Sequence, residues 1–194
     1  MTGSLAASTF LLIFVAELAD KSRMVGLILA STYRRPWPVF WGMTLAYAVL
    51  DGGAVLAGGW LHASLAPRLV YLGTGALFVG LGAAVFVWAE EAEEGARRWL
   101  DKAGKWGPFA VSFAAVAVAE MGDRTQLAVA ALSAESGRAL TVFAAALSAL
   151  AFLNALTVAL GGWLSERLDM AKVHKAGGAL FIVLGLALLY KGLR

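Results

Sequence analysis

Six long apolar stretches, separated by shorter polar connections, make up most of the chain. They cover approximately residues 4–31, 38–61, 69–89, 108–132, 139–164 and 173–190. Each is close to the roughly 20 residues that a helix needs to cross a bilayer. They are rich in Ala and Leu and do not alternate between apolar and polar residues, which argues against the strands of a barrel. The pattern therefore predicts an all-α integral membrane protein with six transmembrane helices.

Composition supports a chain that is surrounded by lipid. Hydrophobic residues make up 60% of it and charged residues 15%, and its mean hydropathy is +0.76. A soluble domain usually has about 25% charged residues and about 45–50% apolar ones. The net charge is +3, but the basic residues form no stripe, so we do not expect nucleic-acid binding. The chain has no cysteine, which excludes disulfides and thiolate metal sites.

The two halves of the chain repeat one another at a constant spacing. Glu17-Leu-Ala-Asp-Lys-Ser recurs 103 residues later as Glu120-Met-Gly-Asp-Arg-Thr. Two further blocks recur at the same spacing: residues 58–61 at 161–164, and residues 75–78 at 178–181. Three matches in one register indicate a duplicated three-span unit.

An odd number of spans in each unit places the two copies in opposite orientations, as in many secondary transporters. We therefore predict two inverted three-helix repeats. Residues 1–89 form the first repeat, residues 107–194 form the second, and residues 90–106 form an acidic and then basic linker between them. The first apolar stretch follows no basic segment and contains Glu17, so we interpret it as part of the mature protein rather than a signal peptide.

The loop charges predict the orientation in the membrane. The first, third and fifth connections hold nine basic residues, whereas the opposite side holds four. Because basic loops stay in the cytoplasm, this bias favours a cytoplasmic linker and external N- and C-termini.

Five acidic residues lie within the predicted spans: Glu17, Asp20, Asp51, Glu120 and Asp123. An acidic residue at the centre of a span costs about 2.5–3.5 kcal/mol on insertion scales, so such residues usually serve function. Glu and Asp three residues apart lie on one face of a helix. Each motif therefore presents two carboxylates to one side, and the repeat would bring Glu17, Asp20, Glu120 and Asp123 around one site.

The chemistry of these side chains suits a hard divalent cation. Ca²⁺ and Mn²⁺ prefer carboxylate, carbonyl and hydroxyl oxygens. The chain offers no cysteine, and we expect His62 and His174 to lie in loops, which argues against a zinc or copper site.

The remaining motif residues have supporting roles in this prediction. Lys21 and Arg124 either balance the carboxylates when the cation is absent or extend toward an interface. Ser22 and Thr125 either bind the cation or hydrogen-bond backbone carbonyls where the helix bends. Gly122 is expected to allow close helix approach.

Asp51 and its repeat counterpart, Asn154, form a second polar pair within the predicted spans. For Asp51 the sequence leaves two roles open, one in the ion path and one purely structural close to a membrane face. Asn154 is expected to hydrogen-bond across helices.

The doubled motif resembles that of uncharacterised protein family 0016, the family of the human Golgi transmembrane protein 165. That family has the pattern Glu-x-Gly-Asp-Lys/Arg-Ser/Thr in each three-span half, and Ala19 departs from it where glycine is expected. The resemblance covers nearly the whole chain. It implies six spans and transport of Mn²⁺ or Ca²⁺ in exchange for protons, and bacterial members are similar to manganese exporters of the cytoplasmic membrane.

We therefore expect a secondary active transporter that exports Mn²⁺ and/or Ca²⁺ from the cytoplasm in exchange for protons. Burial favours a protonated carboxyl and a bound cation favours the carboxylate, so the two substrates compete for one site. The chain has no nucleotide-binding loop, and no nucleophile paired with a base in its spans, so we expect neither a cofactor nor an enzyme. Membrane lipid is an expected partner, and homo-oligomerisation is left open.

Two alternatives from other classes remain open. One is a proton-coupled exporter of a small organic solute, in which the carboxylates bind only protons. The other is a non-transporting membrane scaffold, in which buried Glu–Lys pairs hold the helices together.

Overall fold

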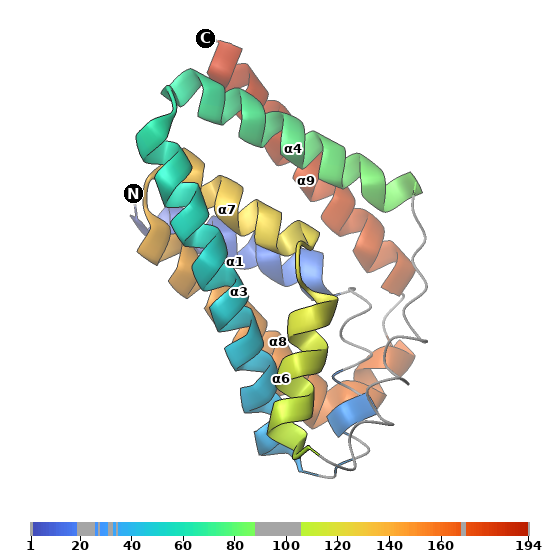
Figure 1. Ribbon diagram of the computed structural model, residues 1–194. Coiled ribbons are helices and arrows are strands. Elements are labelled where there is room, and N and C mark those ends of the chain that lie inside the picture. Colours follow the sequence, from blue (N-terminus) through green and yellow to red (C-terminus); the bar gives the residue numbers. More distant parts are fainter. Residues whose placement is uncertain are drawn as a thin grey trace.

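The computed structural model describes residues 2–18, 26, 28–30, 33, 35–87, 106–167 and 170–193. Its helices are α1 (Thr2–Leu18), α3 (Pro36–Ser64), α4 (Pro67–Val87), α6 (Pro108–Ala119), α7 (Arg124–Ser136), α8 (Ala139–Arg167) and α9 (Met170–Leu193) (Figure 1). These residues contain no strand, so the prediction of an all-α chain is confirmed. Asp20, Lys21 and Ser22, and residues 90–105 of the predicted linker, lie outside the described residues.

Local sequence explains where several helices begin and end. Pro36, Pro67 and Pro108 each begin a helix, where the missing N–H of proline removes no helical hydrogen bond. Helix α7 starts after Asp123, which caps it, and ends at Gly137, whose φ of +64° is typical of a helix C-terminus.

Two described helices, α3 and α8, are long and apolar enough to cross a membrane. Each has 29 residues, which corresponds to about 43 Å of helix against a hydrocarbon core of about 30 Å. Exposed tryptophans lie near both ends of α3, at Trp37 and Trp60, and exposed Val49 and Leu56 lie between them. Apolar surface between aromatic ends is what lipid contact requires. The chain therefore has the features of an integral membrane protein, while the count of six spans stays a prediction.

The fourth predicted span is wrong as a single helix. Instead of one helix over residues 108–132, the chain forms α6 and α7, which are separated by a turn at residues 120–123. His62 and His174 lie within α3 and α9, so their prediction as loop residues is also wrong.

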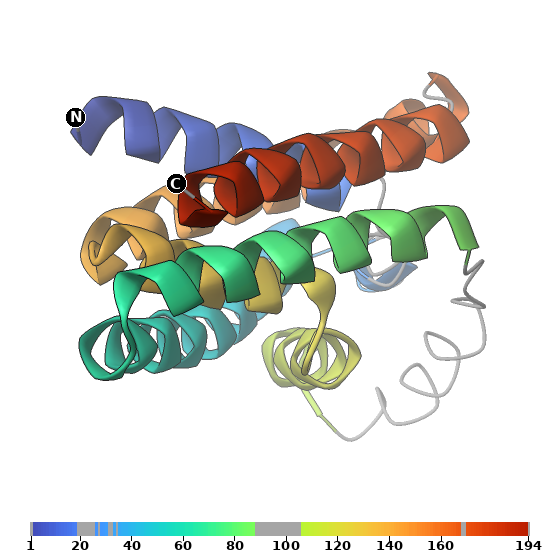
Figure 2. The same ribbon diagram turned by 90° about the horizontal axis from the view of Figure 1, so that it is seen from above.

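Helices α4 and α9 lie side by side and run antiparallel (Figures 1 and 2). Glycines allow their backbones to meet. A Cβ added to Gly75 would lie 2.8 Å from the carbonyl oxygen of Gly185, and one added to Gly82 would lie 2.6 Å from that of Gly178. Gly75 and Gly178 are repeat counterparts, and so are Gly82 and Gly185. Gly75 thus faces Gly185, the counterpart of Gly82, and Gly82 faces Gly178, the counterpart of Gly75. Two helices related by a local two-fold axis make reciprocal contacts of this kind.

The aromatic pair between these helices obeys the same relation. The rings of Phe78 and Phe181 are edge to face, with centroids 5.3 Å apart. They are 103 residues apart in sequence, so each phenylalanine contacts its own repeat counterpart. Helices α3 and α8 begin and end at counterpart positions too.

Both ends of the described chain lie at one end of the helical bundle. Ala6 and Ala7 of α1 line a surface cavity together with Leu140 at the start of α8. Lys191 near the end of α9 pairs at 3.0 Å with Glu135, which lies just before that start. Helix α3 crosses the molecule between this end and the opposite one and packs against α6, α7 and α8. Its buried middle positions the site described next.

Candidate metal centre

The turn between α6 and α7 shapes the site. The N–H of Asp123 donates to the carbonyl oxygen of Glu120 at 3.1 Å. Gly122 occupies the third position of this turn with φ +78°, the value that a type II turn requires and that glycine adopts without strain. A Cβ on Gly122 would meet no atom within 4 Å, so the prediction that this glycine allows close helix approach is wrong. Glycine occurs at position 122 because the turn needs a positive φ there, and not because a larger side chain would clash.

Asp123 is the N-cap of helix α7. The Asp123 carboxylate accepts a hydrogen bond from the N–H of Thr125 at 3.4 Å, which caps the helix. The positive end of the helix dipole favours this negative charge. Arg124 Nε lies 3.7 Å from Asp123 Oδ1, which is within the distance of an ion pair.

Gln126 ties this turn to α3. Its Oε1 accepts a hydrogen bond from the N–H of Gly122 at 2.7 Å, and its Nε2 donates to the carbonyl oxygen of Leu50 at 3.2 Å. Sequence reasoning missed Gln126, although an amide in an apolar segment directly after the motif was a usable signal.

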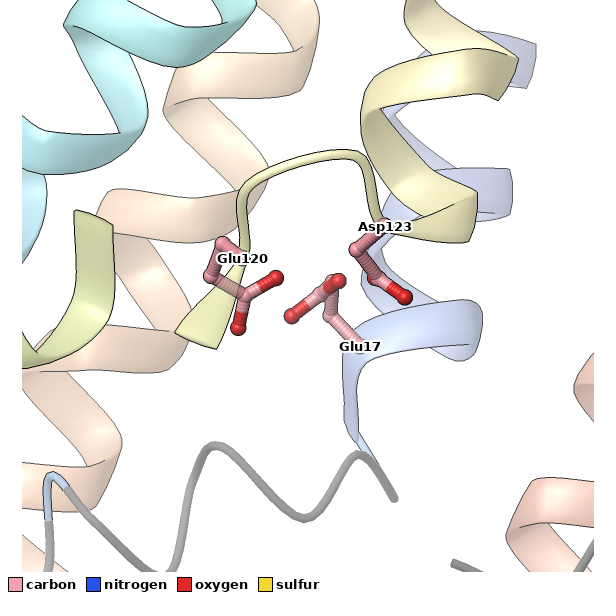
Figure 3. Close-up of side chains that lie close together, drawn as sticks. All are labelled: Glu17, Glu120 and Asp123. Carbon is pink, nitrogen blue, oxygen red and sulfur yellow. The ribbon is translucent and has the colours of Figure 1, made fainter. Parts of the chain in front are cut away.

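Three carboxylates meet at this turn. Glu17 comes from the last turn of α1, Glu120 from the end of α6 and Asp123 from the start of α7, and their side chains point toward one another (Figure 3). One oxygen from each lies within 4.8 Å of the others. Glu17 and Glu120 are buried, and Asp123 is partly buried. Two oxygens on opposite sides of a Ca²⁺ ion at 2.3–2.6 Å would be about 4.6–5.2 Å apart, so the spacing suits one shared divalent cation.

The predicted reason for this meeting is wrong in part. Glu120 and Asp123 were expected on one face of a continuous helix, but the helix breaks between them. They converge because the turn redirects the chain. The prediction that the two motifs lie together holds for Glu17, Glu120 and Asp123, and Asp20 lies outside the described residues.

Two hydroxyl groups hold the glutamates. Thr125 Oγ1 donates to Glu17 Oε1 across the two halves of the chain. The hydroxyl of Tyr47 on α3 donates to Glu120 Oε1 at 2.9 Å and lies 3.4 Å from Glu17 Oε2. Sequence reasoning missed Tyr47. The signal was its position within a predicted span, four residues before Asp51 and therefore on the same helix face. Tyr47 bridges the counterpart glutamates directly.

Asp51 and Asn154 are both buried within long helices. Asn154 Nδ2 donates to Thr44 Oγ1 on α3 at 3.2 Å, which confirms the predicted bond across helices. Asp51 lies at the middle of α3, and its role, in the ion path or purely structural, stays a prediction.

A buried group of carboxylates is costly unless a cation or protons offset its charge. Broken helices that present ligands to a buried site are typical of ion-coupled secondary transporters. Fold and site therefore define a membrane transporter that handles cations.

Comparison with known proteins gives the family. The family model described as "Divalent cation/proton antiporter GDT1" matches residues 5–93 and again residues 108–194. The chain belongs to this family and is therefore a cation/proton antiporter rather than an enzyme.

Curated relatives are similar over most of their length. The protein named "Putative manganese exporter" from Vibrio cholerae is 26% identical over 95% of this chain and 90% of its own. The "GDT1-like protein sll0615" of Synechocystis is 32% identical over 88% of this chain and 89% of its own. No solved structure matches the chain significantly.

Proposed function

We propose that this antiporter exports Mn²⁺ from the bacterial cytoplasm in exchange for protons, and that Glu17, Glu120 and Asp123 bind the cation. The observation that carries the assignment is the meeting of these three carboxylates from both halves of the chain within 4.8 Å. The name of the Vibrio cholerae relative supports Mn²⁺ as cargo. Ca²⁺ is the natural competitor because the ligands are all oxygens.

Asp20 is proposed as the fourth carboxylate because it is the repeat counterpart of Asp123. Lys21 is likewise the repeat counterpart of Arg124, and Ser22 that of Thr125, so each is proposed to have the role of its counterpart. The hydrogen bond from Thr125 to Glu17 supports an equivalent one from Ser22 to Glu120.

The proposed architecture is six spans in two inverted repeats, residues 1–89 and 107–194, joined by the linker 90–106. The reciprocal glycine contacts of α4 and α9 and the pair of Phe78 with Phe181 support it. The match of the family model to residues 5–93 and to residues 108–194 supports a division into the same two halves. Rocking one repeat against the other would expose the central site to either side in turn.

Exchange follows from competition at one acidic site. Protons neutralise the carboxylates when the cation has left, and an arriving cation displaces them. The Arg124 guanidinium beside Asp123 limits the net negative charge of the empty site. Cation and protons therefore cross in opposite directions.

The proposed orientation has both termini outside and the linker in the cytoplasm. It rests on the excess of basic residues in the first, third and fifth connections. The position of both chain ends at one end of the bundle supports an even number of crossings. The cytoplasmic membrane of a bacterium is the proposed location, lipid covers the exposed apolar faces, and homo-oligomerisation is left open.

Transport by purified protein in liposomes tests the proposal. Vesicles that contain a Mn²⁺-sensitive dye should take up Mn²⁺ faster when a pH gradient is imposed, and Glu17→Gln and Glu120→Gln should abolish uptake. Glu135→Gln is the matched control, because this glutamate pairs with Lys191 at the end of the bundle. Uptake that ignores the gradient, or that persists in both site variants, would contradict the proposed exchange.

A further inference from the structure

Asp51 differs from the other buried carboxylates in having no described partner. It lies at the middle of α3 and is 2% exposed. Its Oδ2 has no hydrogen-bond partner, whereas Glu17 and Glu120 accept bonds from Thr125 and Tyr47. The carboxyl group is thus both deeply buried and incompletely satisfied.

No charged group of the described residues pairs with Asp51. Along α3 itself the titratable residues are Tyr47 and His62. The helices that pack against α3 bring few others: α6 has none, and the rest are Arg124 and Glu135 of α7, Glu166 and Arg167 of α8, and Arg68 and Tyr71 of α4. On α7, Arg124 lies 3.7 Å from Asp123 and Glu135 pairs with Lys191. Glu120 and Asp123, at the turn between α6 and α7, are themselves acidic and offer Asp51 no compensating charge. Lys21 and Arg23 are outside the described residues.

Within the described part of the chain, an ionised carboxylate in this position would be a buried charge without compensation. Burying such a charge is far more costly than burying a neutral acid, and a group in this position takes up a proton instead. Burial of this kind therefore favours the protonated, neutral form of Asp51 over the carboxylate.

The repeat counterpart supports a specific role for the carboxyl. Asn154 occupies the equivalent position in α8 and is also buried, but its amide cannot titrate, and it bonds to Thr44. A neutral amide thus satisfies the structural need for a polar group at this depth. Only the first repeat has an ionisable group there.

Asp51 also lies next to the metal centre along α3. It follows Tyr47 by four residues, about one helical turn or 6 Å of rise, and Tyr47 contacts Glu120 and Glu17. Compared with Tyr47, Asp51 lies closer to the end of the bundle that holds the chain termini. With the termini outside, as proposed above, Asp51 lies on the external side of the cation site, from which protons enter.

We propose that Asp51 is a proton-binding site separate from the cation ligands and that it carries one of the exchanged protons. The inference rests on the proposed exchange. Asp51 takes a proton from external water, holds it while buried, and releases it to cytoplasmic water when the other conformation admits water to it. The proton moves inward as the cation moves outward, and Asp51 returns to its starting state in each cycle.

Asp51→Asn tests this role because the amide has the shape of the neutral acid and cannot release a proton. Equilibrium Mn²⁺ binding by the variant should stay within about threefold of wild type, which also shows that the variant folds. In liposomes, its Mn²⁺ flux should respond less steeply to an imposed pH gradient than wild-type flux does, because each cycle carries one proton fewer while the cation ligands still bind protons. Ser112→Ala is the control: Ser112 Oγ is another buried polar atom without a partner, but it does not titrate.

The outcomes separate this inference from the proposed exchange. If wild-type flux ignores the gradient, the exchange itself fails. If wild-type flux follows the gradient and the Asp51→Asn flux follows it equally steeply, Asp51 carries none of the exchanged protons. Infrared spectroscopy adds a readout that is independent of flux. The spectrum of wild type minus Asp51→Asn should contain the band of a protonated buried carboxyl, and a spectrum without that band overturns the proposal.

Discussion

At the residue scale, two hydroxyl groups decide how the counterpart glutamates lie. The Tyr47 hydroxyl bonds to Glu120 Oε1 at 2.9 Å and lies 3.4 Å from Glu17 Oε2, while Thr125 bonds to Glu17 from the other side. Groups that orient ligands in this way shape affinity without binding the metal themselves. If Glu17 and Glu120 bind the cation as proposed, Tyr47 is a positioning residue for them.

Tyr47→Phe should keep the packing of the ring and lose only the hydroxyl. We expect Mn²⁺ affinity to fall about 10- to 100-fold, the usual effect of losing a group that orients metal ligands. Equilibrium binding measures the affinity, and thermal unfolding reports the packing. Tyr190→Phe is the control, because Tyr190 is exposed near the end of α9. An unchanged affinity in Tyr47→Phe would show that the glutamates are held by other contacts.

At the scale of the elements, two kinds of glycine have different purposes. Gly122 allows the turn that separates α6 from α7, because its φ is +78°. Gly75, Gly82 and Gly185 instead let α4 and α9 approach one another. The first kind builds the site, and the second joins the two halves of the molecule.

Two glycines of α4 offer a matched test of this close approach. A Cβ at Gly82 would lie 2.6 Å from the Gly178 carbonyl oxygen, whereas one at Gly80 would meet nothing within 4 Å. Gly82→Ala should therefore destabilise the protein by about 1–3 kcal/mol through overpacking. Gly80→Ala should be neutral or stabilise it by up to about 1 kcal/mol through helix propensity. The unfolding midpoint in detergent compares them, and equal midpoints would argue against tight packing of α4 on α9.

At the scale of the whole molecule, the orientation of the bundle decides which end of it faces the cytoplasm. The absence of native cysteine makes single-cysteine labelling direct. Ser64 ends α3 at the end that holds the termini, and Gly107 precedes α6 at the opposite end. Both are exposed.

In intact cells, Ser64→Cys should react with a membrane-impermeant maleimide, because the positive-inside bias places it outside. Gly107→Cys should react only after the cells are permeabilised. The reverse pattern would invert the proposed topology and would make the same antiporter face the opposite way.

Sequence alone determined the membrane class, the duplication and the acidic motifs, because these are written in local composition and in a constant spacing. Apolar stretches reflect the solvent around a helix, and Glu17 and Glu120 mark equivalent positions wherever the chain folds. Those signals also placed the helices α3 and α8 within three residues of their ends.

Only the tertiary structure decided how the site is made. Whether the helix continues through Glu120 or turns at Gly122 depends on bonds to distant groups, such as those that Gln126 makes with the turn and with Leu50. The bridging position of Tyr47 and the burial of Asp51 likewise depend on which helices pack against α3. Contacts between residues far apart in sequence leave no local pattern, so the carboxylates could be found from sequence, but not the hydroxyls and the turn that bring them together.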